Sequence, residues 1–168
     1  LTRGELNLND PVQIEEIIRL YKPWAVINAA GFVRVDDAEI EYEDCFLSNT
    51  AGPGNLADLC MTYNIKFMTF SSDLVFDGQK MAAYDEDDTV NPLNVYGASK
   101  AQAEQEVLTK NPKALVVRTS AFFSPWDNYN FVSYIVNSLQ RKQQINVIED
   151  VYISPTYVPD LVNASLDL

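Results

Sequence analysis

The sequence has no histidine, and this absence excludes several kinds of catalytic and metal-binding site. Without an imidazole there is no Ser-His-Asp or Cys-His hydrolytic centre and no histidine-ligated zinc. The two thiols, Cys45 and Cys60, lie within one stretch that has a helical pattern. We therefore expect both to be reduced core residues, and neither a disulfide nor a metal-binding pair.

Basic residues and long apolar runs are also scarce. The chain has 12 Lys and Arg against 24 Asp and Glu, which gives a net charge of −12. Nucleic acids and anionic membrane surfaces both require a basic face, so we expect neither as a partner. No apolar run approaches the about 20 residues of a membrane-spanning helix, and no signal peptide is recognisable. These features predict a cytoplasmic protein.

Short apolar segments alternate with helical patterns along the 168 residues. The expected buried strands cover residues 24–30, 65–72, 114–120 and 145–150. The expected helices cover residues 11–22, 43–63, 99–109 and 130–141. This alternation predicts right-handed βαβ crossovers and a parallel sheet, hence an α/β fold. A chain of this length is expected to form one domain.

The first of these helices carries the clearest sequence signals. Asp10 can cap its N-terminus, and Pro11 suits the first helical position. Gln13 completes a pattern like a capping box, in which its side chain bonds the cap N–H. Pro23 ends the helix.

Small and hydroxylated residues follow three of the predicted strands. They are Asn28 to Gly31, Ser71 to Asp73, and Thr119 to Phe122. In a parallel sheet the carboxyl ends of the strands lie at one edge, and ligands bind there. We therefore expect the ligand site along these three segments.

Tyr96 and Lys100 lie four residues apart, where a turn is expected to become a helix. Residues at this spacing share one helix face, although the spacing alone has low specificity. Together with the hydroxyl of Ser72 they suit carbonyl reduction, because hydride attack creates an alkoxide that needs a proton and hydrogen-bond donors. The ammonium of Lys100 would lower the pKa of Tyr96 by stabilising its phenolate.

Six segments carry a resemblance to a known family: "INAAG", "SNTAGPGNLA", "FSSDLVFDG", "YDEDDTVNPLNVYGASKAQAEQ", "VVRTS" and "SPTYVPDL". In this order and spacing they resemble the extended short-chain dehydrogenase/reductases over nearly the whole chain. The resemblance implies a Rossmann-type parallel sheet with flanking helices. It also implies NADPH or NADH as the cofactor and a nucleotide-linked 4-keto sugar as the substrate.

The resemblance assigns roles to individual residues. Tyr96 would be the general acid, Lys100 would tune it and hold the nicotinamide ribose, and Ser72 would hold the substrate oxygen. The implied cofactor-binding residues are Asn28, Ala29, Ala30, Gly31, Asn49, Tyr96 and Lys100. The implied substrate-binding residues are Ser72, Asp73, Thr119 and Ser120. No metal site is implied.

Pro53 is unusual, because it lies inside the helix expected over residues 43–63. Proline lacks the N–H that would bond the carbonyl of Asn49, four residues earlier. One interpretation is a plain kink in the helix. The other uses the resemblance, in which the carbonyl of this asparagine holds a water of a proton relay to Lys100.

The chain departs from the family at its beginning. The G-x-x-G-x-x-G turn that approaches the cofactor pyrophosphate is absent, and so is the strand that decides between NADH and NADPH. We therefore expect residues 1–168 to form a single incomplete NAD(P)-binding domain, the middle of a longer enzyme. The substrate-binding part would start near residues 145–168. Missing segments or a second copy in a homodimer would complete it.

Three functions remain open. The first is an NAD(P)H-dependent reductase of a nucleotide sugar, which the segments "NPLNVYG" and "SPTYVPDL" favour. The second is a related epimerase or dehydratase with the same Tyr and Lys. The third is a non-catalytic, reductase-like binding or regulatory subunit, against which the intact set of Ser72, Tyr96 and Lys100 argues.

Overall fold

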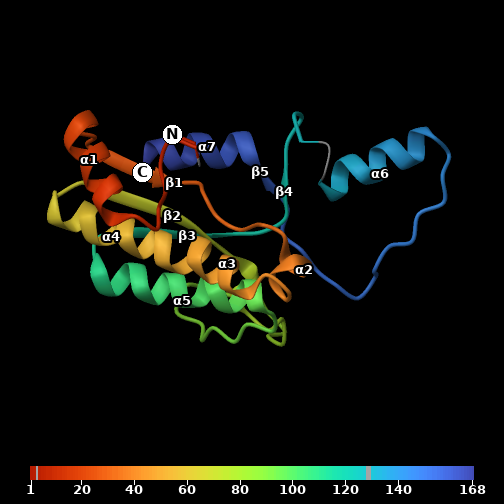
Figure 1. The fold of residues 1–168 in the computed structure, drawn as a ribbon. Helices are drawn as coiled ribbons and strands as arrows, with labels where there is room; N and C mark the ends of the chain where they lie inside the picture. The colour runs from red at the N-terminus through yellow and green to blue at the C-terminus, as the bar shows by residue number, and fades with distance from the viewer. Residues whose placement is uncertain (3, 128–129) are drawn as a thin grey trace. The chain divides into compact units, whose positions relative to one another are not determined.

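The computed structural model describes residues 1–2, 4–127 and 130–168. By its internal contacts the chain divides into two compact units, unit 1 (Leu1–Arg118) and unit 2 (Thr119–Leu168), which Figure 1 colours from red to blue along the chain. The expectation that a substrate-binding part begins near residues 145–168 stays a prediction.

The sheet of unit 1 contains the first three predicted strands. They are β1 (Ala25–Asn28), β2 (Lys66–Ser72) and β3 (Leu115–Thr119), the last of which ends one residue into unit 2. The strand order is β1-β2-β3. β1 and β2 are parallel, with Ala25 opposite Lys66 and Asn28 opposite Thr69. The α/β fold with a parallel sheet is thereby confirmed.

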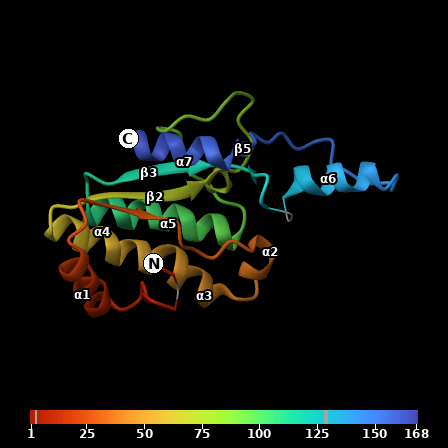
Figure 2. The same cartoon turned by 90° about the horizontal axis from the view of Figure 1, so that it is seen from above.

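Helices cover this sheet and form the core with it. The bounds are α1 (Pro11–Tyr21), α2 (Val35–Ala38), α3 (Tyr42–Phe46), a π-helix η1 (Leu47–Ala51), α4 (Gly52–Thr62), a 3-10 helix η2 (Asp73–Val75) and α5 (Val95–Lys110). Figure 2 shows α4 and α5 along one face of the sheet, and both contact β2. Ile14, Leu56, Phe67 and Val107 meet in the main apolar cluster between these elements.

The predicted cap of α1 is present, but the capping box is not. The carboxylate of Asp10 accepts hydrogen bonds from the N–H groups of Val12 and Gln13, at 3.0 and 3.1 Å. The side chain of Gln13 accepts instead from the N–H of Asn7, at 2.6 Å. The N–H of Asp10, which a capping box would engage, donates instead to the carbonyl of Asn7 at 3.1 Å, and Gln13 fixes the segment that leads into α1.

The helix predicted over residues 43–63 is three helical segments in succession. Between α3 and α4 the π-helix η1 widens the turn, and the N–H of Gly52 donates to the carbonyl of Leu47, five residues earlier. Pro53 follows at the start of α4. The missing N–H of this proline thus falls where the α-helical pattern is already interrupted, and the expected kink takes the form of a π-helical turn.

In the described residues of unit 2 there are two short strands and two helices. They are β4 (Phe122–Phe123), α6 (Phe131–Gln140), β5 (Thr156–Tyr157) and α7 (Val158–Asp167), with β4 parallel to β5. The prediction of α6 is confirmed. The strand predicted over residues 145–150 is wrong, because those residues have no strand partner.

Three further observations concern the predictions made from composition. Among the described residues, no helix is long and apolar enough to cross a membrane. Within the same residues, no group of three or more His, Cys, Asp or Glu side chains is arranged to hold a metal ion. Cys45 and Cys60 are free and buried, and burial raises the pKa of the Cys60 thiol to about 12.

Candidate active site

The carboxyl end of β2 supplies the first predicted site residue. Ser72 is the last residue of β2 and is buried. Its hydroxyl accepts a hydrogen bond from the N–H of Leu74 at 3.1 Å, which caps η2. It also donates to the carboxylate of Asp73 at 3.1 Å. The turn after the strand therefore fixes the Ser72 hydroxyl at the edge of the sheet.

The first turn of α5 lies directly against this strand end. The side chain of Asn94 caps the helix by accepting from the N–H of Gly97 at 2.6 Å, so α5 begins at Val95 rather than near Ser99 as predicted. A Cβ atom added at Gly97 would lie 2.1 Å from the carbonyl oxygen of Leu74. Only glycine permits this close approach between α5 and η2.

The structure brings Ser72, Tyr96 and Lys100 together. Ser72 and Tyr96 interact by a side-chain hydrogen bond, and the Lys100 ammonium lies 5.8 Å from the centroid of the Tyr96 ring. The ammonium donates to the carbonyl of Phe70 at 3.2 Å, so it is anchored to the same strand end. A hydroxyl, a phenol and an ammonium therefore lie next to one another at the end of β2, and these are the groups that carbonyl reduction requires.

Burial dominates the proton affinity of both titratable groups. It raises the pKa of Tyr96 above its usual value, and the hydrogen bond with Ser72 opposes this shift only in part. It also lowers the pKa of Lys100, against the opposing effects of Cys45 and Glu104. Loss of solvent from the phenol therefore sets the direction of the Tyr96 shift, and the expectation that Lys100 lowers this pKa stays a prediction.

The predicted cofactor segment follows β1. The buried side chain of Asn28 donates to the hydroxyl of Thr69 at 3.1 Å and accepts from the N–H of Ala30 at 3.1 Å. These contacts turn the chain just after the strand. Ala29 and Ala30 are exposed at this edge. Their backbone is thus accessible to a ligand at the carboxyl end of the sheet.

Asn49 connects this segment to α5. Its side chain exchanges two hydrogen bonds with the backbone of Phe32, at 2.8 and 3.2 Å, and donates to the hydroxyl of Ser99 at 3.0 Å. A Cβ at Gly31 would lie 2.9 Å from the Asn49 side-chain oxygen and 3.5 Å from the Lys100 ammonium. The absence of a side chain at Gly31 therefore leaves space beside Lys100.

The remaining predicted site residues are Asp73, Thr119 and Ser120. Asp73 is exposed in η2, next to Ser72. Thr119 and Ser120 belong to unit 2, where the N–H of Ser120 donates to the hydroxyl of Thr156 at 3.4 Å. Their roles in substrate binding stay predictions.

Sequence reasoning missed a buried ion pair beside the site. Arg118 on β3 donates two hydrogen bonds to the carboxylate of Glu104 on α5, at 3.0 and 2.7 Å. The hydroxyl of Ser71 donates to the same carboxylate. The available signal was the position of Glu104, four residues after Lys100 and therefore on the same helix face.

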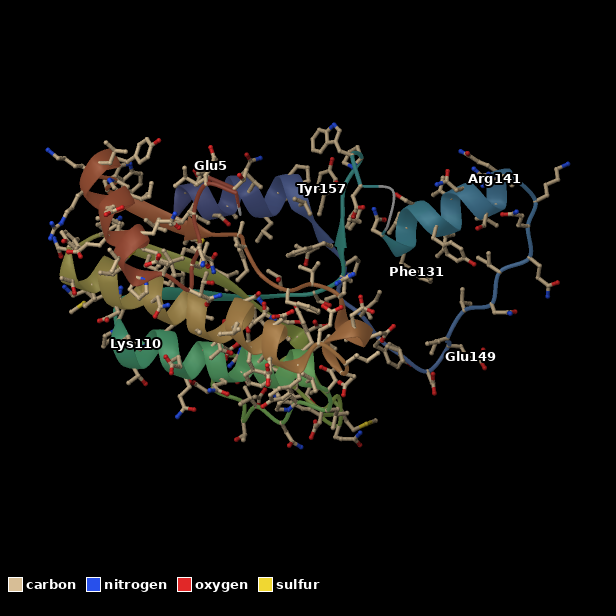
Figure 3. All side chains as sticks on the ribbon, in the orientation of Figure 1. Glu5, Lys110, Phe131, Arg141, Glu149 and Tyr157 are labelled. Atoms are coloured by element: carbon tan, nitrogen blue, oxygen red, sulfur yellow. The ribbon has the colours of Figure 1, made fainter. Side chains whose placement is uncertain are left out.

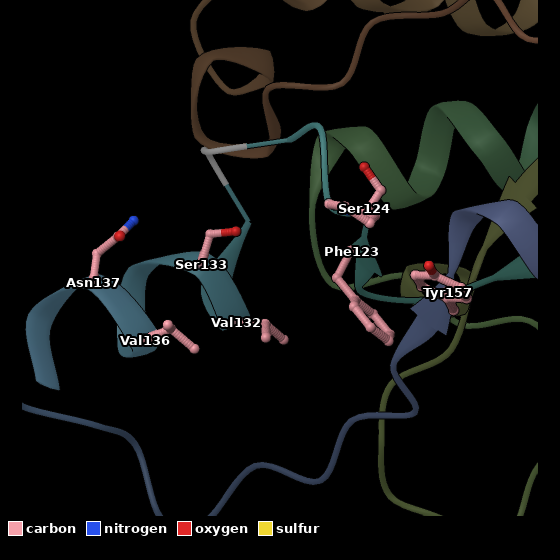
Figure 4. A pocket seen from close by; sticks show the side chains of 8 residues that line it. Phe123, Ser124, Val132, Ser133, Val136, Asn137 and Tyr157 are labelled. Carbon is pink, nitrogen blue, oxygen red and sulfur yellow. The ribbon is translucent and has the colours of Figure 1, made fainter. Parts of the chain in front are cut away.

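Unit 2 contains a hollow of its own, with a volume of about 330 Å³. Figure 4 shows it between α6 and the short strands, where aromatic, aliphatic and polar side chains border it. The lining includes Phe123, Ser124, Val132, Ser133, Asn137 and Tyr157. The rings of Phe123 and Tyr157 lie 5.2 Å apart.

A parallel sheet flanked by helices, with Ser72 at a strand end and with Tyr96 and Lys100 on the helix against it, defines a Rossmann-like α/β class. Comparison with known proteins narrows this class. The chain belongs to the family described as RmlD substrate binding domain, whose model matches residues 1–168. The family resemblance found in the sequence is thereby confirmed.

The relatives carry consistent names. A dTDP-4-dehydrorhamnose reductase from Aggregatibacter actinomycetemcomitans is 35% identical over 165 residues, which are 98% of this chain and 56% of that protein. One from Mycolicibacterium smegmatis is 38% identical over 144 residues, 85% of this chain and 44% of that protein. The chain thus spans about half the length of the curated relatives it matches.

Solved structures agree with this. A dTDP-4-dehydrorhamnose reductase from Bacillus anthracis in complex with NADP has a TM-score of 0.92 and 31% identity, covering 100% of this chain and 61% of that chain. A UDP-glucose 4-epimerase from Thermotoga maritima has a TM-score of 0.80 but 22% identity, covering 99% of this chain and 59% of its own. The second likeness shows the fold alone.

Proposed function

We propose that the full-length protein reduces the 4-keto group of a nucleotide-linked sugar with NADPH or NADH, as a dTDP-4-dehydrorhamnose reductase does. The observation that carries this proposal is the convergence of Ser72, Tyr96 and Lys100 at the end of β2. The names of the relatives support the substrate class, and the NADP bound to a similar structure supports the cofactor.

The chemistry follows from the groups in this space. When bound, the cofactor would supply a hydride to the sugar carbonyl, and negative charge would develop on the carbonyl oxygen. Ser72 redirects its one hydroxyl proton from Asp73 to that oxygen, and Tyr96 transfers its phenolic proton to it. A phenol with a raised pKa binds its proton tightly, so proton transfer to the sugar oxygen becomes favourable only as the alkoxide forms.

Lys100 has two tasks in this proposal. Its positive charge stabilises the phenolate that remains after proton transfer. An ammonium has three N–H donors, and one of them is directed to the carbonyl of Phe70. The ribose hydroxyls of the cofactor would accept from the others.

The segment after β1 fits a dinucleotide. Gly31 has no side chain to fill the space beside Lys100, and Asn28 and Asn49 hold the surrounding backbone. Ala29 and Ala30 would lie against the cofactor. For the substrate, we propose contacts from Asp73, Thr119 and Ser120. A homodimer, further segments of the protein and a cytoplasmic location stay predictions.

Substitution Tyr96→Phe in the full-length protein tests the proposal. It removes only the phenolic hydroxyl, whose proton acts in the transition state rather than in binding. We expect kcat to fall by about 10²–10⁴-fold while the Kd for NADPH changes little. Tyr134→Phe, which removes the same atom from α6, is the matched control and should leave kcat unchanged. Near-normal turnover by Tyr96→Phe would exclude Tyr96 as the acid.

A further inference from the structure

We propose that Glu104, through its ion pair with Arg118 on β3 and its hydrogen bond from Ser71 on β2, holds α5 against the end of β2 and thereby sets the geometry between Ser72, Tyr96 and Lys100. This inference rests on the proposed function and deepens it. Neither Glu104 nor Arg118 is placed in contact with the substrate or the cofactor.

The carboxylate of Glu104 is buried and fully engaged. Its Oε1 atom accepts from Arg118 Nε at 3.0 Å and from the hydroxyl of Ser71, and its Oε2 atom accepts from Arg118 Nη2 at 2.7 Å. The side chains of Glu104 and Arg118 are only 10% and 25% exposed. A bidentate contact of this kind fixes the relative orientation of the two side chains as well as the distance between them.

The contacts join the two elements that carry the candidate catalytic groups. On β2, Ser71 directly precedes Ser72. On α5, Glu104 lies one helical turn after Lys100, whose ammonium donates to Phe70 on β2. Two neighbouring residues of the strand are thus bonded to two successive turns of the helix. Sliding or rotating α5 would break both contacts.

Arg118 extends the network to the segment after η2. Its Nη1 atom donates to the carbonyl of Glu86 at 3.2 Å, and its guanidinium lies 4.9 Å from the centroid of the Phe76 ring. Phe76 in turn stacks on Tyr84 at 4.1 Å. One guanidinium on β3 therefore contacts both α5 and the segment that leads to α5.

Glu104 also contributes to the charge around Lys100. The titratable groups that face this ammonium are Tyr96 and Glu104 from α5 and Cys45 from α3. From β2 it meets the carbonyl of Phe70, and the neighbouring Gly31 carries no charge. Glu104 raises the pKa of Lys100, against the effect of burial. Its removal should therefore lower that pKa.

The kinetic test compares Glu104→Gln with Glu106→Gln in the full-length protein. Both lie on α5, and Glu106 forms a more exposed pair with Lys110 at 2.9 Å. We expect Glu104→Gln to lower kcat by about 10–100-fold, because small misplacements of catalytic groups have effects of this size, with little change in the KM for the sugar. Glu106→Gln should behave as wild type. An unchanged kcat, or a rise in KM that accounts for the loss, would overturn the proposal.

A second variant covers the case in which Glu104→Gln does not fold. Ser71→Ala removes one small hydroxyl and leaves the ion pair in place. We expect it to fold and to lower kcat by about tenfold or less, again without a matching change in KM. A kcat equal to that of wild type would contradict the role of the Ser71–Glu104 contact.

A readout without turnover separates this inference from the proposed function. In full-length protein labelled with ¹³C at the lysine Cε, the Lys100 signal is assigned with Lys100→Met and titrated by NMR. The pKa of Lys100 should be lower in Glu104→Gln than in wild type and unchanged in Glu106→Gln. If the full-length protein shows no reductase activity but Glu104→Gln lowers the pKa of Lys100, the proposed function is wrong and the coupling between Glu104 and Lys100 is still supported. An unchanged pKa would overturn the coupling.

Discussion

The two units of the chain differ in how deeply their apolar side chains are buried. All buried apolar side chains of the described residues belong to unit 1, between Ile14 and Val107. The buried residues described in unit 2 are the polar Asn130, Ser138 and Ser165. Figure 3 shows the side chains of α6 and labels Phe131 at its start, which is 50% exposed.

This difference matches the demands of the proposed chemistry. Proton transfer requires a donor that is held within a fraction of an ångström, and packed helices and strands provide this better than exposed surfaces do. Ser72, Tyr96 and Lys100 all belong to elements that share the core of unit 1. No apolar side chain described in unit 2 is buried, so the contribution of these side chains to stability should be small.

Truncating one apolar side chain in each unit should give the largest difference between the units, in the free energy of unfolding. Ile14 is 1% exposed and Leu139 is 62% exposed. We expect Ile14→Ala to lower the free energy of unfolding by about 2–5 kcal/mol, because it leaves a cavity in the core. Leu139→Ala should stay within about 0.5 kcal/mol. Urea denaturation of the full-length variants measures both, and equal losses would remove the distinction between the units.

Adding one methyl group at the contact between α5 and η2 should have the next largest effect. At Gly97 the new Cβ would lie 2.1 Å from the carbonyl oxygen of Leu74, whereas at Gly4 the nearest atom is the Thr2 hydroxyl at 4.0 Å. We expect Gly97→Ala to lower the free energy of unfolding by about 1–3 kcal/mol and to reduce activity, because α5 must move to admit the methyl group. Gly4→Ala is the control. Thermal unfolding with parallel assays tests this, and a stable, active Gly97→Ala would contradict the close contact.

Removing the ammonium of Lys100 should have a smaller effect, which is divided between catalysis and cofactor binding. We expect Lys100→Met to lower kcat and to weaken NADPH binding by about tenfold each, or about 1.4 kcal/mol per step. The pKa seen in the pH–rate profile should rise, because the phenolate of Tyr96 loses its cation. Lys142→Met, an exposed change in unit 2, should alter neither. Wild-type cofactor affinity in Lys100→Met would exclude the ribose contact.

Much of unit 1 is predictable from sequence because its elements are long and bounded by strong signals. Asp10 and Pro11 mark the start of α1, and the apolar runs of β1 and β2 exceed what a loop would contain. Tyr96, Lys100 and Ser72 were found because a helix face and a strand end each place their residues by simple rules.

The errors of prediction arise where tertiary contacts decide the structure. β4 and β5 have two residues each, too few for a periodic pattern, and the apolar residues 145–150 find no strand partner among the described residues. The π-helical turn before Pro53 depends on packing against α5. The Glu104–Arg118 pair joins a helix to a strand, which neither local periodicity nor a motif predicts.

The stoichiometry of turnover tests the central claim most directly. Full-length protein is mixed with dTDP-4-dehydrorhamnose and NADPH or NADH, and both the oxidised cofactor and the sugar product are quantified. We predict that one cofactor molecule is oxidised for each 4-keto group reduced, and that the reaction requires Tyr96. Conversion of the sugar without net oxidation of the cofactor would indicate an epimerase or dehydratase, and binding of both ligands without turnover would indicate a silent subunit; either result would contradict the reductase proposal.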